Sequence, residues 1–183
     1  MSERSDRFDA LFVSHSSDIV AYCKWRAASA NDAEDAAAEV FLTAWRRLDE
    51  LPEDESVRVW LYATARRVIA NQRRSNRRRI ALHERLAGMA KATPQEKPSP
   101  SQEETLVHDA LRRLAPRDRE VLLLAEWEDL STQQIADVLG CLTVTARGRL
   151  HRARRRFRTA FEELREDARQ TPHALQQLCE GGS

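Results

Sequence analysis

The side chains in this sequence that could do chemistry are cations rather than nucleophiles. Residues 145–158, TARGRLHRARRRFR, hold seven arginines, one histidine and no acid, and residues 66–79 hold seven more arginines and no acid. Guanidinium groups bind phosphates and base edges, so both runs are candidates for nucleic-acid contact. Such a run can also be a solvated helix face or a disordered tail. Which of these interpretations applies depends on the helices and turns predicted around the run.

No catalytic motif accompanies these cations. The sequence has no glycine-rich phosphate loop, no nucleophile motif, and neither an H-E-x-x-H nor a C-x-x-C pattern. Cys23, Cys141 and Cys179 are far apart, which favours reduced thiols over a redox or metal role. We therefore expect a protein that is not an enzyme, with no metal, no cofactor and no small-molecule substrate.

The formal net charge of +1 hides a sharp segregation of charge along the chain. Residues 31–55 carry nine acids against two arginines, whereas the two basic runs carry no acid. A chain that sorts its charges in this way is expected to face two kinds of partner. On the acidic helix, Asp35 and Glu39 are four residues apart on one face, where like charges cost stability unless a basic partner relieves them. A protein partner and a solvated helix face both fit this pattern.

Composition favours a mostly helical protein in the cytoplasm. Charged residues make up 32% of the 183 residues, and glycine (5) and proline (6) are scarce. No apolar run approaches the roughly 20 residues of a membrane span, and the N-terminus lacks the apolar core of a signal peptide. Insertion into a membrane is therefore not expected.

The N-terminal half predicts three or four helices. A short one starts at Phe8, a second covers 19–28, and a third is capped by Asn31 with Glu34 three residues on. The third has a buried stripe at three-four spacing, formed by Ala37, Val40, Phe41, Ala44, Trp45 and Leu48. An acidic loop, 49–56, leads to a helix that has Trp60 on its core face. The other face of this helix carries the arginines of residues 66–79. Asn71 on that helix could read a base edge or simply be exposed.

The C-terminal half predicts a helix-turn-helix. Residues 88–102 hold three prolines among polar and small residues, which indicates a linker between two helical domains. Beyond it, Pro116 opens a helix, and Ser131 with Gln134 caps the next. Gly140 can take the left-handed turn conformation, and a second helix follows. A plain helical hairpin with a solvated basic face is the alternative.

The helical wheel sorts the arginines of the second helix. Ala146, Leu150, Ala153 and Phe157 follow 4-3-4 spacing and are expected to face the core. The opposite side, which would enter the major groove, carries Gly148, His151, Arg152 and Arg155, with Arg147 beside them. Arg149 lies at the flank, where phosphate is the expected target. Arg154 and Arg156 are expected to cover the domain's own surface or pair with its acids, and Arg158 is left open.

The order of these elements resembles the bacterial RNA polymerase sigma factors, in the two-domain form of the extracytoplasmic-function (ECF) group. The segment DAEDAAAEVFLTAWRRL is similar to the family's core-binding segment, and VWLYATARRVIANQRRSNRRR is similar to its −10 segment. The segment LAPRDREVLLLAEWEDLSTQQIADVLGCLTVTARGRLHRARRRFR resembles its −35 reading domain. The resemblance covers nearly the whole chain outside the linker and both termini.

The resemblance implies an all-α fold of two small helical domains joined by a flexible linker. Residues 1–87 would bind core polymerase and the −10 element, 88–104 would be the linker, 105–165 the −35 helix-turn-helix domain, and 166–183 a tail. Loop 49–56 would help to hold a flipped −10 base. Partners would be core RNA polymerase and promoter DNA; in many relatives an anti-sigma protein covers these surfaces, and its presence here is left open. The implied polymerase contacts are Asp32, Asp35 and Glu39; the −10 contacts are Arg66, Arg67, Asn71, Arg74 and Arg77; the −35 contacts are Thr145, Arg147, Gly148, Arg149, His151, Arg152 and Arg155.

Two other functional classes compete with this interpretation. A helix-turn-helix regulator that binds duplex DNA as a dimer would need no polymerase, but it leaves the acidic helix, the second basic run and the linker without a role. A general RNA-binding adaptor would use both basic runs, but it leaves the helix-turn-helix unexplained.

Overall fold

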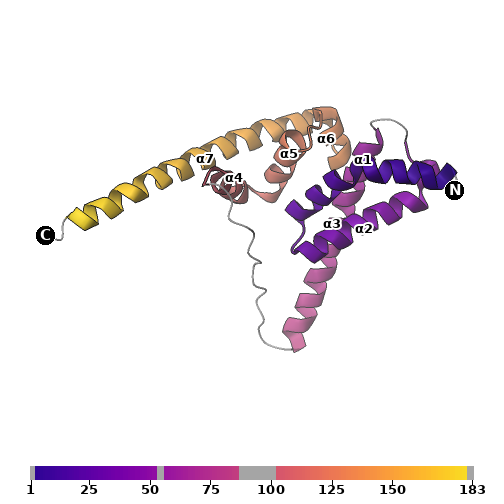
Figure 1. Ribbon diagram of the computed structural model, residues 1–183, viewed down its shortest axis with the longest axis horizontal. Coiled ribbons are helices and arrows are strands. Elements are labelled where there is room, and N and C mark those ends of the chain that lie inside the picture. The colour runs from indigo at the N-terminus through magenta and orange to yellow at the C-terminus, as the bar shows by residue number, and fades with distance from the viewer. Residues whose placement is uncertain (1–2, 53–55, 87–101, 181–183) are drawn as a thin grey trace. The chain divides into compact units, whose positions relative to one another are not determined.

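The computed structural model describes residues 3–52, 56–86 and 102–180. These residues form seven α-helices and one short 3-10 turn, with no β-strand among them, so the all-α prediction is confirmed. The helices group into two compact units, the first built on α1, α2 and α3 and the second on α4, α5 and α7 (Figure 1).

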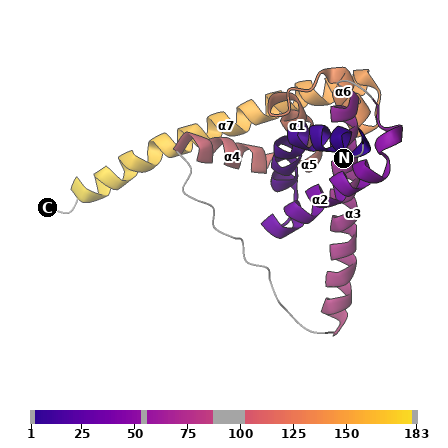
Figure 2. The ribbon, with the colours of Figure 1, turned by 45° about the vertical axis from the view of Figure 1, so that its right-hand side comes forward.

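The first unit is a three-helix arrangement in which every helix packs on the other two (Figure 2). Its helices are α1 (Glu3–Arg26), α2 (Ala30–Arg46) and α3 (Ser56–Leu86), with the 3-10 turn η1 (Leu48–Glu50) after α2. Tyr22 and Tyr62 are fully buried, and their ring centroids lie 5.2 Å apart. This contact joins α1 to α3, so the arginines on α3 are carried by a helix that is anchored in the core.

Helix α1 is longer than the sequence indicates. We predicted two short helices, one starting at Phe8 and one covering 19–28; the stretch Ser14–Asp18 between them is polar and poor in helix formers. The structure instead has one helix of 24 residues. Packing against both neighbouring helices outweighs the weak local propensity, as tertiary contacts commonly do.

The start and the end of α2 also differ from the prediction. The capping residue is Ser29 rather than Asn31, because the Ser29 hydroxyl oxygen accepts a hydrogen bond from the Asp32 backbone N–H at 3.1 Å. At the other end Trp45 is 40% exposed instead of core, although the stripe from Ala37 to Ala44 is buried as predicted. The Trp45 ring meets Phe8 edge-on at 5.1 Å and lies 5.3 Å from the Arg4 guanidinium.

The second unit is built on α4 (Gln102–Arg113), α5 (Pro116–Glu126) and α7 (Thr143–Glu180), and the short helix α6 (Thr132–Leu139) precedes α7. Pro116 is the first residue of α5, as predicted, since proline has no N–H to lose at that position. Helices α4 and α5 both pack on α7. Leu111, Leu123 and Leu124 fill the space between them and are almost completely buried.

Helix α7 is continuous over 38 residues and passes the predicted domain end at Arg165 without a break. The tail 166–183, expected to be a short frayed helix, is thus the continuation of α7 as far as Glu180. Most of the predicted linker 88–104 and loop residues 53–55 lie outside the described residues, and so does the side chain of Cys179. Helix α4 begins at Gln102, inside the predicted linker.

Candidate nucleic-acid interface

The start of α6 and the turn that follows this helix form as the sequence predicts. The Ser131 backbone N–H donates to Gln134 Oε1 at 2.8 Å, and the Gln134 backbone N–H donates to Ser131 Oγ at 3.3 Å. This reciprocal capping box fixes the start of α6. Gly140 follows the helix with φ of +64°, in the left-handed region that favours glycine.

One side-chain and one backbone hydrogen bond then hold the start of α7 and the turn before it against α6. The Thr143 hydroxyl donates to Gln133 Oε1 at 2.6 Å, and the Cys141 backbone N–H donates to the Ala136 carbonyl oxygen at 3.0 Å. The end of α7 that carries the basic residues is therefore positioned by the preceding helix and turn.

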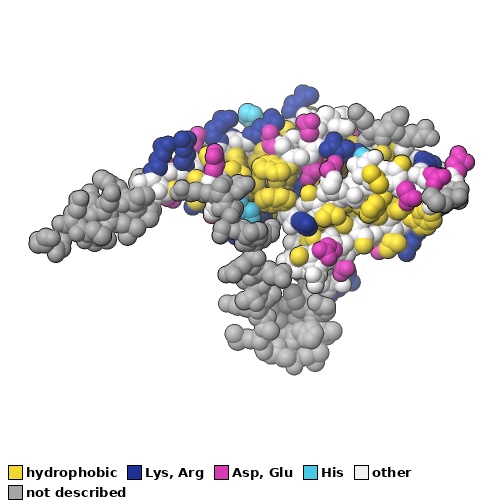
Figure 3. Space-filling model, viewed as in Figure 1, with side chains coloured by type: hydrophobic (Ala, Val, Ile, Leu, Met, Phe, Trp, Pro, Cys, Tyr) yellow, Lys and Arg dark blue, Asp and Glu magenta, His cyan; other side chains and the backbone are white. Residues whose placement is uncertain are grey.

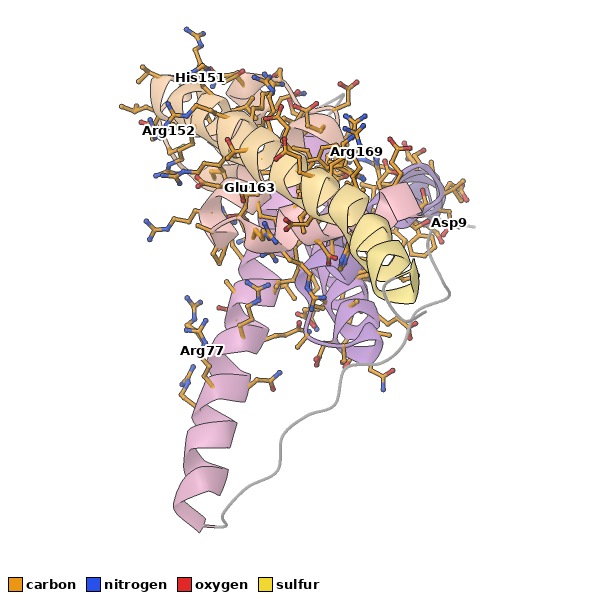
Figure 4. All side chains as sticks on the ribbon, turned by 90° about the vertical axis from the view of Figure 1, so that its left-hand side faces the viewer. Asp9, Arg77, His151, Arg152, Glu163 and Arg169 are labelled. Atoms are coloured by element: carbon orange, nitrogen blue, oxygen red, sulfur yellow. The ribbon has the colours of Figure 1, made fainter. Side chains whose placement is uncertain are left out.

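The wheel assignment of α7 agrees with the burial of its side chains. Ala146, Leu150 and Ala153 are buried, and Phe157 is half-buried rather than fully in the core. Arg147, His151, Arg152 and Arg155 are exposed, and Thr145, Gly148 and Arg149 are intermediate. Figure 4 shows His151 and Arg152 on the outer side of the helix, and in Figure 3 basic side chains gather along the edge formed by α7.

Two arginines of the basic run pair with acids of the second unit. Arg154 Nε lies 2.8 Å from Glu126 Oε1, and Arg156 pairs with Asp118, whose side chain is only 11% exposed. The prediction that these two pair with the domain's own acids is confirmed. Among the described residues the side chains of Arg147, Arg152 and Arg155 make no ion pair, so these remain available to an external anion.

Arg158, left open by the sequence, lies at an apolar hollow of about 480 Å³ in the second unit. Phe157, Phe161 and Trp127 also line it, which explains why Phe157 is not fully buried. An apolar wall of this kind suits a protein contact better than a phosphate contact. The basic run thus has three different environments within fourteen residues.

The second basic face lies on α3. With about 100° of rotation per residue, the five predicted −10 residues fall within an arc of about 140° on this helix. Arg67, Asn71, Arg74 and Arg77 are exposed and Arg66 is intermediate, and Figure 4 shows Arg77 projecting from α3. Arg74 donates to Asn71 Oδ1, which couples these two side chains. Neighbouring Arg73 instead donates to the Arg26 carbonyl oxygen at the end of α1.

A groove of about 520 Å³ separates part of this face from α2. Asp35 and Glu39 line it from α2, and Trp60, Arg67 and Asn71 line it from α3. Sequence reasoning placed Trp60 in the core and assigned the acids and the basic face to different partners. In the structure Trp60 is half-buried, and both sets of side chains share one groove. The wheel of either helix alone could not reveal this, because the groove needs both.

The acidic face of α2 is exposed beside this groove. Asp32 is partly buried, and its carboxylate accepts a hydrogen bond from the Ser29 hydroxyl at 2.8 Å. Asp35 and Glu39 are exposed, and Arg46 Nη1 lies 3.8 Å from Glu39 Oε1. Leu42, 49% exposed, lies on the same face at spacings of seven and three residues. Sequence reasoning missed Leu42, although its spacing was readable.

Other kinds of site are not apparent in the described part of the chain. No group of three or more histidine, cysteine or carboxylate side chains there could hold a metal ion. Nor does any described helix combine the length and apolarity that crossing a membrane requires.

Comparison with known proteins gives consistent matches in both units. The family model for sigma-70 region 2 matches residues 11–79, and that for sigma-70 region 4 matches residues 104–157. The ECF RNA polymerase sigma factor SigL of Mycobacterium tuberculosis is 30% identical over 157 residues, which cover 85% of this chain and 89% of SigL. The RNA polymerase sigma factor YlaC of Bacillus subtilis is 26% identical over 168 residues, covering 90% and 97%.

Solved structures share the fold. The sigma factor RpoE of Bartonella quintana, in complex with the anti-sigma factor NepR, matches with a TM-score of 0.69 and 21% identity over 85% of this chain and 96% of that one. CnrH in complex with the cytosolic domain of CnrY matches with a TM-score of 0.60 and 20% identity, covering 85% and 88%.

Proposed function

This chain belongs to the ECF group of RNA polymerase sigma factors, and we propose how its two units divide promoter recognition between them. As a member of this family it binds core RNA polymerase and directs promoter-specific initiation of transcription. Sigma factors are non-enzymatic initiation factors, so bond formation is assigned to the polymerase. The boundaries proposed are 1–87 for the polymerase and −10 unit, 88–104 for the linker, 105–165 for the −35 unit and 166–183 for the tail.

We propose that α7 reads the −35 element in the major groove. The observation that carries this role is the division of its arginines: Arg154 and Arg156 are held by internal acids, whereas Arg147, Arg152 and Arg155 face solvent. Arginine reads guanine through two parallel hydrogen bonds in that groove, and phosphate contacts fix the register. Arg149, at the flank, is assigned to phosphate, and Thr145, Gly148 and His151 complete the surface.

The basic face of α3 is proposed to hold the −10 element. The groove beside it offers an aromatic side chain, Trp60, and the polar side chain of Asn71, which suit a base taken out of the stack. Asp35 and Glu39 on the opposite wall repel phosphate, so the backbone should follow Arg66, Arg74 and Arg77 instead. Capturing an unstacked base offsets the few kcal/mol that opening costs for each base.

The acidic face of α2 is proposed to bind core polymerase. Asp32, Asp35 and Glu39 supply negative charge that duplex DNA would repel, and Leu42 supplies an exposed apolar anchor among them. The two solved relatives are bound to an anti-sigma factor and to the cytosolic domain of CnrY, respectively. A regulator of this kind is a third proposed partner.

The mechanism proposed is bivalent. Each unit binds DNA weakly, and polymerase holds both at the correct spacing, so the effective concentration of the second unit makes the pair selective. The test combines the purified chain with core polymerase on a promoter library and scores specific transcripts. Specific transcripts with shared −35 and −10 elements are expected.

Absence of both core binding and initiation would refute this function. The dimeric helix-turn-helix regulator, which the comparisons do not favour, makes the opposite prediction. It would bind a palindromic duplex tightly as the isolated chain, and polymerase would add nothing.

A further inference from the structure

Two large apolar side chains are exposed at the start of α7. Leu142 is 73% exposed and Val144 is 69% exposed, whereas the neighbouring Ala146 is fully buried. Exposing this much apolar surface in water has no benefit for the fold. Both residues lie at the end of the helix that the preceding turn presents, beside the arginines assigned to DNA.

Leu142 occupies the capping position at the start of α7, but its side chain cannot cap the helix. Its carbonyl oxygen accepts from the backbone N–H groups of Thr145 at 2.9 Å and Ala146 at 3.0 Å, which makes it the residue that caps α7. Serine, threonine, aspartate or asparagine there would accept a helix N–H through its side chain and add about 1 kcal/mol of stability. Leucine cannot do so, so neither capping nor packing explains this residue.

Val144 lies on the helix face that points away from the core. Val144, Gly148, His151 and Arg155 follow 4-3-4 spacing, opposite the buried stripe of Ala146, Leu150 and Ala153. Gly148 adds no side chain to this face, and a Cβ there would lie 3.4 Å from Arg152 Nη1. Val144 thus shares its face with Arg155, and Arg147 and Arg152 lie on either side of that face. This positive setting is complementary to duplex DNA and not to a second basic surface.

We infer that Leu142 and Val144, two exposed apolar side chains at the start of α7, contact the C5-methyl group of thymine in the major groove of the −35 element. Thymine alone among the four bases presents a methyl group there, and small apolar side chains recognise it by contact. The inference rests on the proposed −35 role of α7. It adds a preference that arginine hydrogen bonds cannot supply, since these bonds read guanine.

The test removes the methyl group rather than the base. Each thymine of the −35 element, on either strand, is replaced in turn by deoxyuridine, and binding by the full chain with core polymerase is measured. Loss of one methyl contact should weaken binding about fourfold at one or two positions. In Val144→Ala or Leu142→Ala that position-specific loss should shrink to less than about twofold, because most of the apolar side chain that meets the methyl group is removed.

Several controls separate the possible outcomes. Val144→Thr keeps a methyl group and should keep the deoxyuridine effect, and Val13→Ala, 78% exposed in the first unit, should leave it unchanged. Alanine is a better helix former than valine, so Val144→Ala should fold.

Three outcomes would count against these proposals. If the wild-type chain gives specific transcripts, but the deoxyuridine effect is the same in these variants at every position, the thymine contact is refuted and the proposed function is not. Weakened core binding in these variants, with the deoxyuridine effect intact, would also refute the thymine contact and would assign Leu142 and Val144 to a contact with polymerase. Absence of specific transcripts from the wild-type chain would instead refute the proposed function.

Discussion

At the scale of single residues, the partner of each arginine decides what that arginine can do. Arg152 and Arg156 are four residues apart and have the same chemistry. Arg156 pairs with a nearly buried carboxylate, Asp118, whereas Arg152 is exposed on the outer side of α7. Charge density in the sequence therefore overstates the number of cations available to DNA.

Exchanging each of these arginines for alanine should give different defects. Arg152→Ala should weaken −35 recognition by about 1–3 kcal/mol, since a two-bond contact to a base is lost. Arg156→Ala should lower the free energy of unfolding by about 1–2 kcal/mol, because the Asp118 carboxylate loses its partner. Binding assays on −35 variants and denaturant titrations measure the two quantities. Equal effects of both changes on −35 recognition would contradict the assignment.

A second residue-scale prediction concerns the acidic face of α2. Asp35→Lys with Glu39→Lys should weaken core binding about tenfold or more, because the changes reverse charges at a surface proposed to meet a basic partner. Glu34→Lys, which changes the net charge by half as much, is the control, since Glu34 is exposed on the same helix but points to another side. If the control weakens core binding as strongly as the double change, net charge and not this face determines the affinity.

At the scale of elements, the helices create surfaces that no single helix contains. The groove between α2 and α3 joins the acidic pair to Trp60, Arg67 and Asn71. The α6–α7 turn depends likewise on contacts between two helices, through Gln133 and Thr143. Positions that hold these elements together should influence DNA binding without touching DNA.

Gly140 is such a position. A Cβ built there meets nothing within 4 Å, so the cost of substitution comes from the backbone φ of +64° alone. Gly140→Ala should lower the free energy of unfolding by about 1 kcal/mol, and Gly140→Asn by less, because asparagine tolerates the left-handed region. Thermal or denaturant unfolding of both variants measures this. An alanine variant as stable as the wild type would mean that the turn adopts another conformation.

At the scale of the whole molecule, the two units are proposed to act as a pair that polymerase holds in register. Their separate weak contacts become selective only when both can bind one promoter at once. Each unit carries its own basic face, on α3 and on α7, so neither unit needs the other to contact DNA. The distance between the two promoter elements should therefore matter only in the holoenzyme.

Inserting about 5 base pairs between the −10 and −35 elements should test this, because it rotates one element by about half a helical turn. Initiation by the holoenzyme should fall by about a hundredfold. Binding by the chain without polymerase should change little. Initiation that tolerates the insertion would show that the two contacts are not coupled through polymerase.

The sequence by itself determined the local features of this protein. These features are helical periodicity, the Ser131–Gln134 capping box and the left-handed Gly140. Each depends on residues within a few positions of one another, so each can be recognised from the sequence alone. The same periodicity correctly predicted that Arg154 and Arg156 turn toward the domain's own acids, although it could not name those acids.

Only the tertiary structure decided the features that join distant parts of the chain. Packing on α2 and α3 makes α1 a single helix, Phe8 and Arg4 meet an exposed Trp45, and the α2–α3 groove brings Asp35 close to Trp60. Asp118 and Arg156 are 38 positions apart in sequence and form a pair. Such contacts depend on how helices cross and on side-chain shape, and periodicity within one helix specifies neither.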